Sequence, residues 1–274
     1  QIAREKALAA GDAVEEKKNK AGPSAMAGEE AAMRMIPIIE LCKHAQGLVT
    51  AMGVSMGLGG GAIMSKGTTE QKERWALPLL TLEKVGAWAI SEPNAGSDAF
   101  GQMKTLAGRD GNGGYVINGS KMFISGAGAT DVLVLMARPG DADSGAKGIS
   151  TFVIPANAEG VSYGKNEEKM GWHSQPTRMV TLEDVRIPAS NRVGEEGDGF
   201  AIAMKGLDGG RLNIATCSLG GAQAALLRAR NYLHERQQFG KPLAAFQALQ
   251  FKLADMATNL VAARQMVRLS LLHI

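Results

Sequence analysis

Two segments, Trp88-Ala-Ile-Ser-Glu-Pro-Asn-Ala-Gly-Ser-Asp98 and Lys121-Met-Phe-Ile-Ser125, carry more information about this chain than any other stretch. Each reads as an apolar strand whose end breaks into small residues with hydroxyl groups, and the first also contains glycine. Backbone N–H groups and the hydroxyls of Ser91, Ser97 and Ser125 can then reach a ligand at the strand ends. The pattern predicts a site for a flat, polar molecule.

Composition limits the classes of protein to which the chain can belong. It has 274 residues, 45% of them apolar, enough for a full core in one large or two ordinary domains. The net charge is +3 and the basic residues are spread along the chain, so no nucleic-acid partner is expected. Cys42 and Cys217 lack metal-ligand spacing, and the four histidines are scattered. We expect no metal site and a reducing compartment.

The amino-terminal third reads as helical. Residues 1–20 are dense in Ala, Glu and Lys, which favours a helix. A second helical pattern covers 29–54, and the glycine cluster that follows should end it. Thr68-x-x-Gln71 is a capping box that should open a third helix, ending near Leu80.

The most apolar stretch runs from Gly47 to Met64. Its glycines should break it before it reaches the roughly 20 residues that a membrane helix needs, so no membrane span is expected. The chain begins with Gln1 and has no apolar signal core, so we expect the true amino terminus, and any targeting segment with it, to be missing.

After Leu82 the apolar pattern changes to that of short strands. They are rich in Val, Ile, Phe, Tyr and Thr and are separated by turn sequences such as Gly-Asn-Gly-Gly and Asn-Gly-Ser. This spacing predicts a β-sandwich or barrel. The predicted strands are 85–91, 114–118, 121–125, 131–138, 149–155 and 177–187.

Helices return from Asp198 onward. Apolar residues recur at spacings of three and four over 212–233 and again over 249–267. The pattern predicts two long helices that pack as an antiparallel pair, hinged at Phe239-Gly-Lys-Pro242. The fold class is therefore α+β with several domains, which are a helical domain over 1–84, a β domain over 85–192 and a helical domain over 193–274.

The two opening segments, together with Arg236-Gln-Gln-Phe-Gly240, resemble the acyl-CoA dehydrogenase family of flavoproteins. Gly171-Trp-His-Ser-Gln-Pro-Thr-Arg178 and the segment 207–219 resemble the isobutyryl-CoA group of that family. The resemblance implies a β domain between two helical domains. It also implies that family members continue through two further helices, and that the glutamate acting as base lies beyond Ile274, so that no catalytic residue is expected within the chain.

The resemblance implies that the chain binds FAD and works as a homo-oligomer, a dimer or tetramer. The Ser91 hydroxyl would lie near the pyrimidine ring, Phe123 near the N5 edge, and Arg236 on the pyrophosphate of a neighbouring subunit. From the residues alone, a buried strand residue is the better reading of Phe123, and Arg236 could equally cap helix carbonyls. The expected FAD-binding residues are Trp88, Ile90, Ser91, Ser97, Phe123, Ile124, Ser125, Arg236, Phe239, Phe246 and Gln247.

By the same resemblance, the acyl and pantetheine parts of the substrate would lie against a stretch between two helices. Its glycines also fit a plain turn. Gly210 stands where some relatives carry their catalytic glutamate and cannot act as a base, and Glu92 reads as a structural residue that hydrogen-bonds its own turn. The expected substrate-binding residues are Ser97, Asp208, Gly209, Gly210 and Arg211.

The implied activity is the α,β-dehydrogenation of a short, branched acyl-CoA such as isobutyryl-CoA, with electrons passed to an electron-transfer flavoprotein. A broader fatty-acyl-CoA dehydrogenase and a non-catalytic flavin-binding scaffold of the same fold remain alternatives. The implied location is the mitochondrial matrix in a eukaryote or the cytoplasm in a bacterium.

Overall fold

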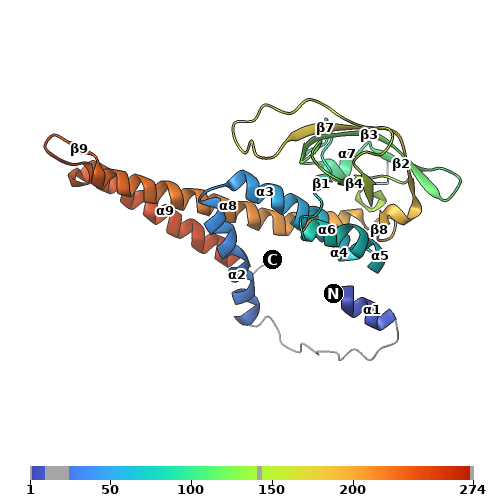
Figure 1. The fold of residues 1–274 in the computed structure, drawn as a ribbon, viewed down its shortest axis with the longest axis horizontal. Coiled ribbons are helices and arrows are strands. Elements are labelled where there is room, and N and C mark those ends of the chain that lie inside the picture. The colour runs from blue at the N-terminus through green and yellow to red at the C-terminus, as the bar shows by residue number, and fades with distance from the viewer. Residues whose placement is uncertain (1, 10–24, 141–143, 272–274) are drawn as a thin grey trace. The chain divides into compact units, whose positions relative to one another are not determined.

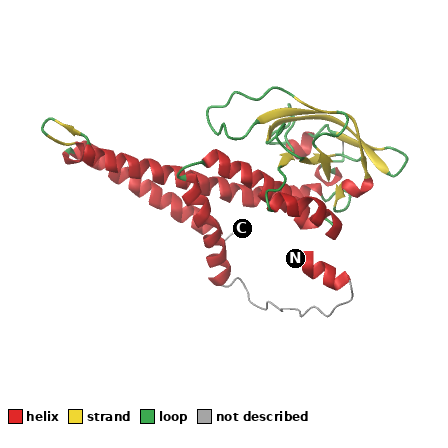
Figure 2. Ribbon diagram, viewed as in Figure 1, coloured by secondary structure: helices red, strands yellow, loops and turns green. Residues whose placement is uncertain are grey.

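A computed structural model describes residues 2–9, 25–140 and 144–271 (Figure 1). By its internal contacts the chain forms two compact units. The first is Gln1–Lys18 with Ala51–Leu207, and the second is Asn19–Thr50 with Asp208–Ile274. Part of the predicted first helix is present as α1 (Ile2–Ala9), while 10–20 lie outside the described residues. The predicted order of helices, then strands, then helices is confirmed (Figure 1). Figure 2 shows the helices and strands by colour.

The glycine cluster does not end the helix that precedes it. The chain continues from α3 (Gln46–Met52) through the wide turns of η1 (Gly53–Gly60) into α4 (Gly61–Lys66). The prediction of a break is wrong because tertiary packing outweighs the cost of glycine in a helix, about 1 kcal/mol each. A Cβ atom at Gly59 would lie 3.7 Å from side chains of Leu79 and Val134, so the bare backbone lets this helix approach its neighbours closely.

Because the helix over 46–66 is unbroken, its glycines do not by themselves exclude a membrane span, contrary to the expectation from sequence. It has 21 residues and a mean hydropathy of 1.4, which by length and composition alone is enough to cross a membrane. In the structure, 44% of its apolar window is buried, and core helices of soluble proteins satisfy the same criteria. Ala62 and Ile63 of α4 belong to the hydrophobic core that covers one face of a β-sheet.

The capping box opens the next helical run as predicted. The Gln71 N–H donates to the Thr68 hydroxyl at 3.2 Å, and the Thr68 N–H donates to the Gln71 side chain at 3.0 Å. The helix then continues without interruption to Leu80. Its segments are α5 (Thr69–Gln71), η2 (Lys72–Ala76) and α6 (Leu77–Leu80).

Two four-stranded sheets follow in the first unit, in agreement with the predicted sandwich. The first has the order β1-β4-β5-β8, with β1 parallel to β4 and the other pairs antiparallel. The second has the order β2-β3-β7-β6 and is antiparallel throughout. The strands are β1 (Gly86–Ala89), β2 (Leu106–Arg109), β3 (Gly114–Ser125), β4 (Val132–Ala137), β5 (Ser150–Pro155), β6 (Val161–Tyr163), β7 (Thr177–Pro188) and β8 (Arg192–Val193).

The first sheet is covered on both faces. Ala87, Leu133 and Phe152 belong to the core shared with the second sheet, whereas Trp88 and Val134 belong to the core shared with helices. This is why every residue of β4 is buried, and why its sequence is a continuous apolar run rather than an alternating one. The unit therefore has three layers, which are helices, the first sheet and the second sheet.

The second sheet departs from the prediction at Asn118-Gly119-Ser120. Instead of a hairpin turn between two strands, these residues form an irregularity within the single strand β3, because both halves of β3 pair with β7. Strands β2, β6 and β8 were not predicted. They are two to four residues long, too short to show a period. Short helical turns complete the unit at α7 (Ala99–Gln102), η3 (Ala146–Gly148) and η4 (Ala189–Asn191).

The second unit contains α2 (Ala25–Cys42), most of α8 (Gly199–Glu235) and α9 (Gln247–Leu271). Helices α8 and α9 run side by side in opposite directions, as predicted (Figure 1). They are joined by a tight hairpin. Its parts are β9 (Gln237–Gln238), β10 (Lys241–Pro242) and η5 (Leu243–Ala245).

Candidate functional site

The carboxyl end of β1 is fastened to β3 at the point where the two motifs meet. The Met122 N–H donates to the Ser91 carbonyl at 2.8 Å. At the far end of β3, Ser125 pairs with Thr177 of β7. The ends of the two segments, residues 90–92 and 121–122, are therefore held together at one edge of the β-sandwich.

Three serine hydroxyls in the two segments are free to bind a ligand. Those of Ser91, Ser97 and Ser125 make no hydrogen bond to any described residue, although Ser91 and Ser125 are half-buried. A hydroxyl group both donates and accepts, so each can bind a polar ligand without displacing a protein partner.

Phe123 departs from ordinary strand geometry at the same edge. Its φ is +57°, a left-handed conformation that aromatic residues rarely adopt, and it lies at a register shift of β3 between Lys121 and Ile124. As a result its side chain is 62% exposed, whereas Ile124 is buried in the core between the sheets. Residues held in strained backbone conformations cluster at functional sites, so Phe123 marks this edge independently of any motif.

Trp88 and Ile90 lie deeper than the serines. Both are buried in the core on the helix-facing side of the first sheet. The indole N–H of Trp88 is buried and has no hydrogen-bond partner within the described part of the chain. Buried polar groups are normally satisfied, so this N–H is available to a group outside the described residues.

Behind the edge lies a buried ion pair. The Lys121 ammonium donates to the Glu92 carboxylate at 2.9 Å and to the Ile90 carbonyl at 3.1 Å. The carboxylate also accepts from the backbone N–H groups of Lys104 and Thr105, at 2.7 and 3.0 Å, and from the Thr105 hydroxyl at 2.5 Å. The structural role expected for Glu92 is confirmed, although it holds residues 104–105 as well as its own turn.

The environment shifts both pKa values of this pair. Burial lowers the pKa of Lys121 to about 8, against the attraction of Glu92. Burial by itself would raise the pKa of Glu92, but the charge and hydrogen bond of Lys121, with the hydrogen bonds from Thr105 and Lys104, hold it below its usual value. Glu92 is therefore a fully engaged carboxylate and a poor proton acceptor.

The second unit carries the remaining expected FAD-binding residues at its hairpin. Phe239 is 91% exposed, has a φ of +55°, and its ring packs edge-on against Phe246 at 6.1 Å between ring centroids. The Lys241 ammonium lies 4.4 Å from the centre of the Phe246 ring. Gln247 is the first residue of α9.

Arg236 lies at the carboxyl end of α8. Its N–H donates to the Tyr232 carbonyl at 2.9 Å, and its carbonyl accepts from Leu243 at 2.8 Å. The guanidinium makes no hydrogen bond or ion pair with any described residue, so it does not cap helix carbonyls there. The Arg236 side chain, which is expected to bind the pyrophosphate of the cofactor, is therefore free in this unit.

The four residues over 208–211 do not form a turn between two helices. They lie inside α8, which is continuous from residue 199 to residue 235, and that part of the prediction is wrong. Asp208 and Arg211 form an ion pair of 2.8 Å one turn apart, and this pair supports the helix across its two glycines. A Cβ atom on Gly209 would meet no atom within 4 Å, so the helix is bare on that side.

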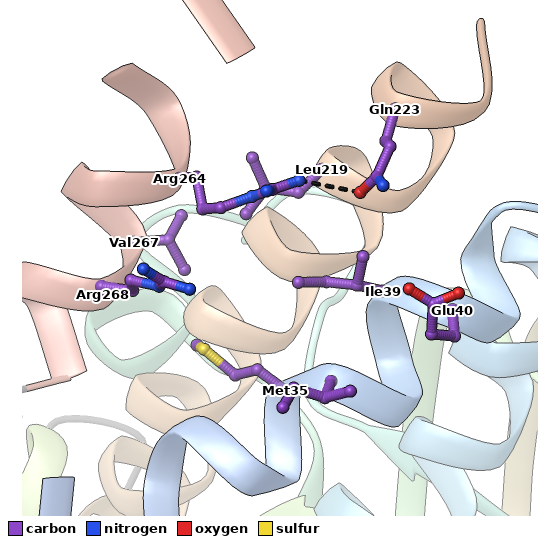
Figure 3. Close-up of a pocket in the computed structure, with 9 residues that line it drawn as sticks. Met35, Ile39, Glu40, Leu219, Gln223, Arg264, Val267 and Arg268 are labelled. Carbon is purple, nitrogen blue, oxygen red and sulfur yellow. Dashed lines mark hydrogen bonds between the residues drawn. The ribbon is translucent and has the colours of Figure 1, made fainter. Parts of the chain in front are cut away.

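A cavity lies in the second unit, away from the hairpin (Figure 3). It has a volume of about 210 Å³, and Arg264 donates to Gln223 across one side at 2.7 Å. None of the residues expected to bind cofactor or substrate lines it. Its lining residues are Met35, Ile36, Ile39, Glu40, Leu219, Gln223, Arg264, Val267 and Arg268.

Sequence reasoning did not assign a place to Trp172. Like Phe123, it is a partly exposed aromatic residue with a positive φ, +56°. Its loop is fastened to the end of β3 by a hydrogen bond from the Gly126 N–H to the Pro176 carbonyl at 2.8 Å. The signal in the sequence is the aromatic residue between glycine and histidine in Gly171-Trp-His.

Comparison with known proteins agrees with these observations. Two family models match, described as the middle domain (residues 87–185) and the C-terminal domain (residues 197–271) of acyl-CoA dehydrogenases. The chain is 47% identical to mitochondrial isobutyryl-CoA dehydrogenase of Dictyostelium discoideum over 84% of its own length and 55% of that protein. It is 50% identical to the Bos taurus enzyme of the same name, over 74% of the chain and 48% of the relative.

The structures agree as well. Butyryl-CoA dehydrogenase from Megasphaera elsdenii superposes with a TM-score of 0.81 at 43% identity, covering 85% of this chain and 60% of that one. The chain spans about half the length of the isobutyryl-CoA dehydrogenases that it matches. Both family models match in the expected order and together cover more than half of the chain, which therefore belongs to the acyl-CoA dehydrogenase family.

Proposed function

We propose that the protein containing this chain is an FAD-dependent dehydrogenase of short acyl-CoA thioesters, with isobutyryl-CoA as its preferred substrate. The observation that carries the proposal is the edge formed by the end of β1 and the irregular part of β3. Unpartnered serine hydroxyls and an exposed phenylalanine in a left-handed conformation occur there together. The identity to two isobutyryl-CoA dehydrogenases supports the choice of substrate.

The residues of the edge fit a flavin. The hydroxyls of Ser91 and Ser125 suit the polar pyrimidine part of the ring system, the exposed ring of Phe123 suits its apolar part, and the unpartnered Trp88 N–H suits one of its acceptor atoms. Bound FAD would supply the acceptor for the hydride that leaves the β carbon, since no side chain can accept one. The chain's own residues would bind and orient the ring and exclude water from it.

The α proton requires a base that this edge does not provide. Glu92 is the buried carboxylate beside it, and that group accepts four hydrogen bonds and has a lowered pKa. A base should instead have a pKa near the working pH and reach its proton. We infer that the base is a group other than Glu92.

The hairpin of the second unit would serve the same cofactor from a neighbouring subunit. The free guanidinium of Arg236 has the planar geometry that suits pyrophosphate oxygens, and Phe239, Phe246 and Gln247 would contact the cofactor beside it. A homo-oligomer is then required for a complete site. Asp208 to Arg211 would border the acyl-CoA, and an electron-transfer flavoprotein would reoxidise the flavin.

The test uses the whole protein, purified without added flavin. It should be yellow, and its absorbance near 450 nm should bleach anaerobically with isobutyryl-CoA at lower concentration than with butyryl-CoA or longer acyl-CoA. Preferential bleaching by butyryl-CoA would instead support the broader fatty-acyl-CoA reading. If no acyl-CoA reduces the bound flavin, the result would support the alternative of a non-catalytic flavin-binding scaffold. A colourless protein that cannot be reconstituted with FAD would reject the proposal.

A further inference from the structure

Three consecutive residues at the end of β1 are tied to two consecutive residues of β3. The Ile90 carbonyl accepts from the Lys121 ammonium, the Ser91 carbonyl accepts from the Met122 N–H, and the Glu92 carboxylate accepts from Lys121 again. Strands β1 and β3 belong to different sheets, so these contacts fasten the two sheets together at one point. The very next residue of β3 is Phe123, with its left-handed backbone.

A lysine in this position is costly unless it has a specific task. Its side chain is fully buried, and Arg138, also fully buried, acts on it as a further positive charge. A buried ion pair seldom adds net stability compared with apolar residues of similar size, because both charges must leave water. Such pairs are better at fixing one arrangement of the chain, since the ammonium has to meet its acceptors in a single geometry.

We propose that Lys121 is a positioning residue: with Glu92, it holds the end of β1 against the irregular segment of β3, so that Ser91 and Phe123 stand ready for the flavin before it binds. This inference rests on the proposed function, because it takes the edge as the flavin site. Lys121 itself does not reach the edge. It acts through the Ile90 carbonyl, which precedes Ser91, and through Met122, which precedes Phe123.

The test must separate positioning from folding. Lys121→Met alone leaves a buried, unpaired carboxylate and is expected to fold poorly. The double variant Lys121→Met/Glu92→Gln removes both charges and keeps one side-chain oxygen for the Thr105 N–H, although the Lys104 N–H loses its acceptor. It should therefore fold better than Lys121→Met. Lys104→Met is the matched control, because the Lys104 side chain is exposed and only its backbone N–H contacts Glu92.

Two measurements on the whole protein test whether Lys121 positions the edge. The first is hydrogen exchange of the Met122 amide without flavin, and the second is the dissociation constant for FAD. In the double variant we expect exchange at least tenfold faster and FAD binding at least tenfold weaker, with far-UV circular dichroism unchanged and Lys104→Met like the native protein. Native exchange and native FAD affinity in a folded double variant would overturn the proposal.

A second variant keeps the test decisive if the double variant does not fold. Thr105→Val removes one neutral donor to Glu92 without changing charge or size, and should give a smaller increase in both readouts. No increase in either readout would overturn the proposal. If the native protein binds no FAD, the proposed function fails, while the exchange readout still shows whether Lys121 fixes the edge.

Discussion

Replacing Arg138 with methionine should cost the first unit about 3 kcal/mol of stability, because this buried cation is held almost entirely by backbone. The Arg138 guanidinium donates to the carbonyls of Met103 at 2.9 Å, Phe100 at 2.8 Å and Gly145 at 2.5 Å, and to the Ser144 hydroxyl at 3.2 Å. It thereby joins the segment that follows the first motif to the loop before β5.

The magnitude follows from what remains after the change. Methionine has a similar length but no donor, so the carbonyls of Met103 and Phe100 lose their partner. The Gly145 carbonyl keeps a hydrogen bond from the Gly148 N–H at 3.3 Å. An unsatisfied buried polar group costs about 1–3 kcal/mol. The desolvation of the guanidinium, which methionine avoids, offsets part of this total. Unlike a carboxylate partner, the carbonyls cannot be removed by a second substitution. Two unpaired carbonyls cost about 2–6 kcal/mol in total, so a net loss of about 3 kcal/mol should remain after the offset.

Urea unfolding followed by tryptophan fluorescence measures the loss, since Trp75 and Trp88 both lie in the core of this unit. Arg109→Met is the control. Arg109 is 63% exposed and pairs with Glu196 at 2.6 Å on the surface, so its loss should cost less than about 1 kcal/mol. Equal costs for the two variants, or a loss below 1 kcal/mol for Arg138→Met, would refute the reasoning from unpaired carbonyls.

Two further outcomes are expected of the native chain. Leu79→Ala should destabilise the first unit by about 3 kcal/mol, since Leu79 is fully buried among the helix-facing core residues, whereas Leu77→Ala, at a side chain 46% exposed, should cost less than about 1 kcal/mol; similar urea midpoints would contradict this. Between pH 8 and 10.5 the unfolded state should bind more protons than the folded state, because burial lowers the folded pKa of Lys121 to about 8. The contribution of Lys121 to the free energy of unfolding should therefore rise with pH, and an identical pH slope in Lys121→Met/Glu92→Gln would contradict it.

Local chemistry in the sequence predicts a good part of this fold. The capping box at Thr68 and Gln71 forms both of its hydrogen bonds, and the strand patterns over 131–138 and 149–155 become β4 and β5. These features depend on neighbouring residues or on a clear apolar run, which a single sequence contains. The antiparallel pair α8 and α9 follows for the same reason, from a long period and a short hinge.

The failures occur where distant residues decide the local structure. The glycines of η1 remain helical because side chains such as Leu79 and Val134, far away in sequence, pack against them. Asn118-Gly119 has the sequence of a hairpin turn, yet it stays within β3 because β7 pairs with both sides of it. No pattern within ten residues contains that information.

In the candidate site, too, some features follow from local sequence and others depend on distant residues. Which residue types gather at the edge is readable from the motifs, but the conformation of Phe123 and the pairing of Glu92 with Lys121 depend on contacts between two sheets. An exposed aromatic in a left-handed conformation, a buried ion pair and the buried Trp88 N–H, which has no partner among the described residues, each work against the stability of this region. Stability does not account for three such costs within one region. A bound ligand would account for them, because it would pair the Trp88 N–H, cover the ring of Phe123 and use the geometry that we propose Lys121 to fix.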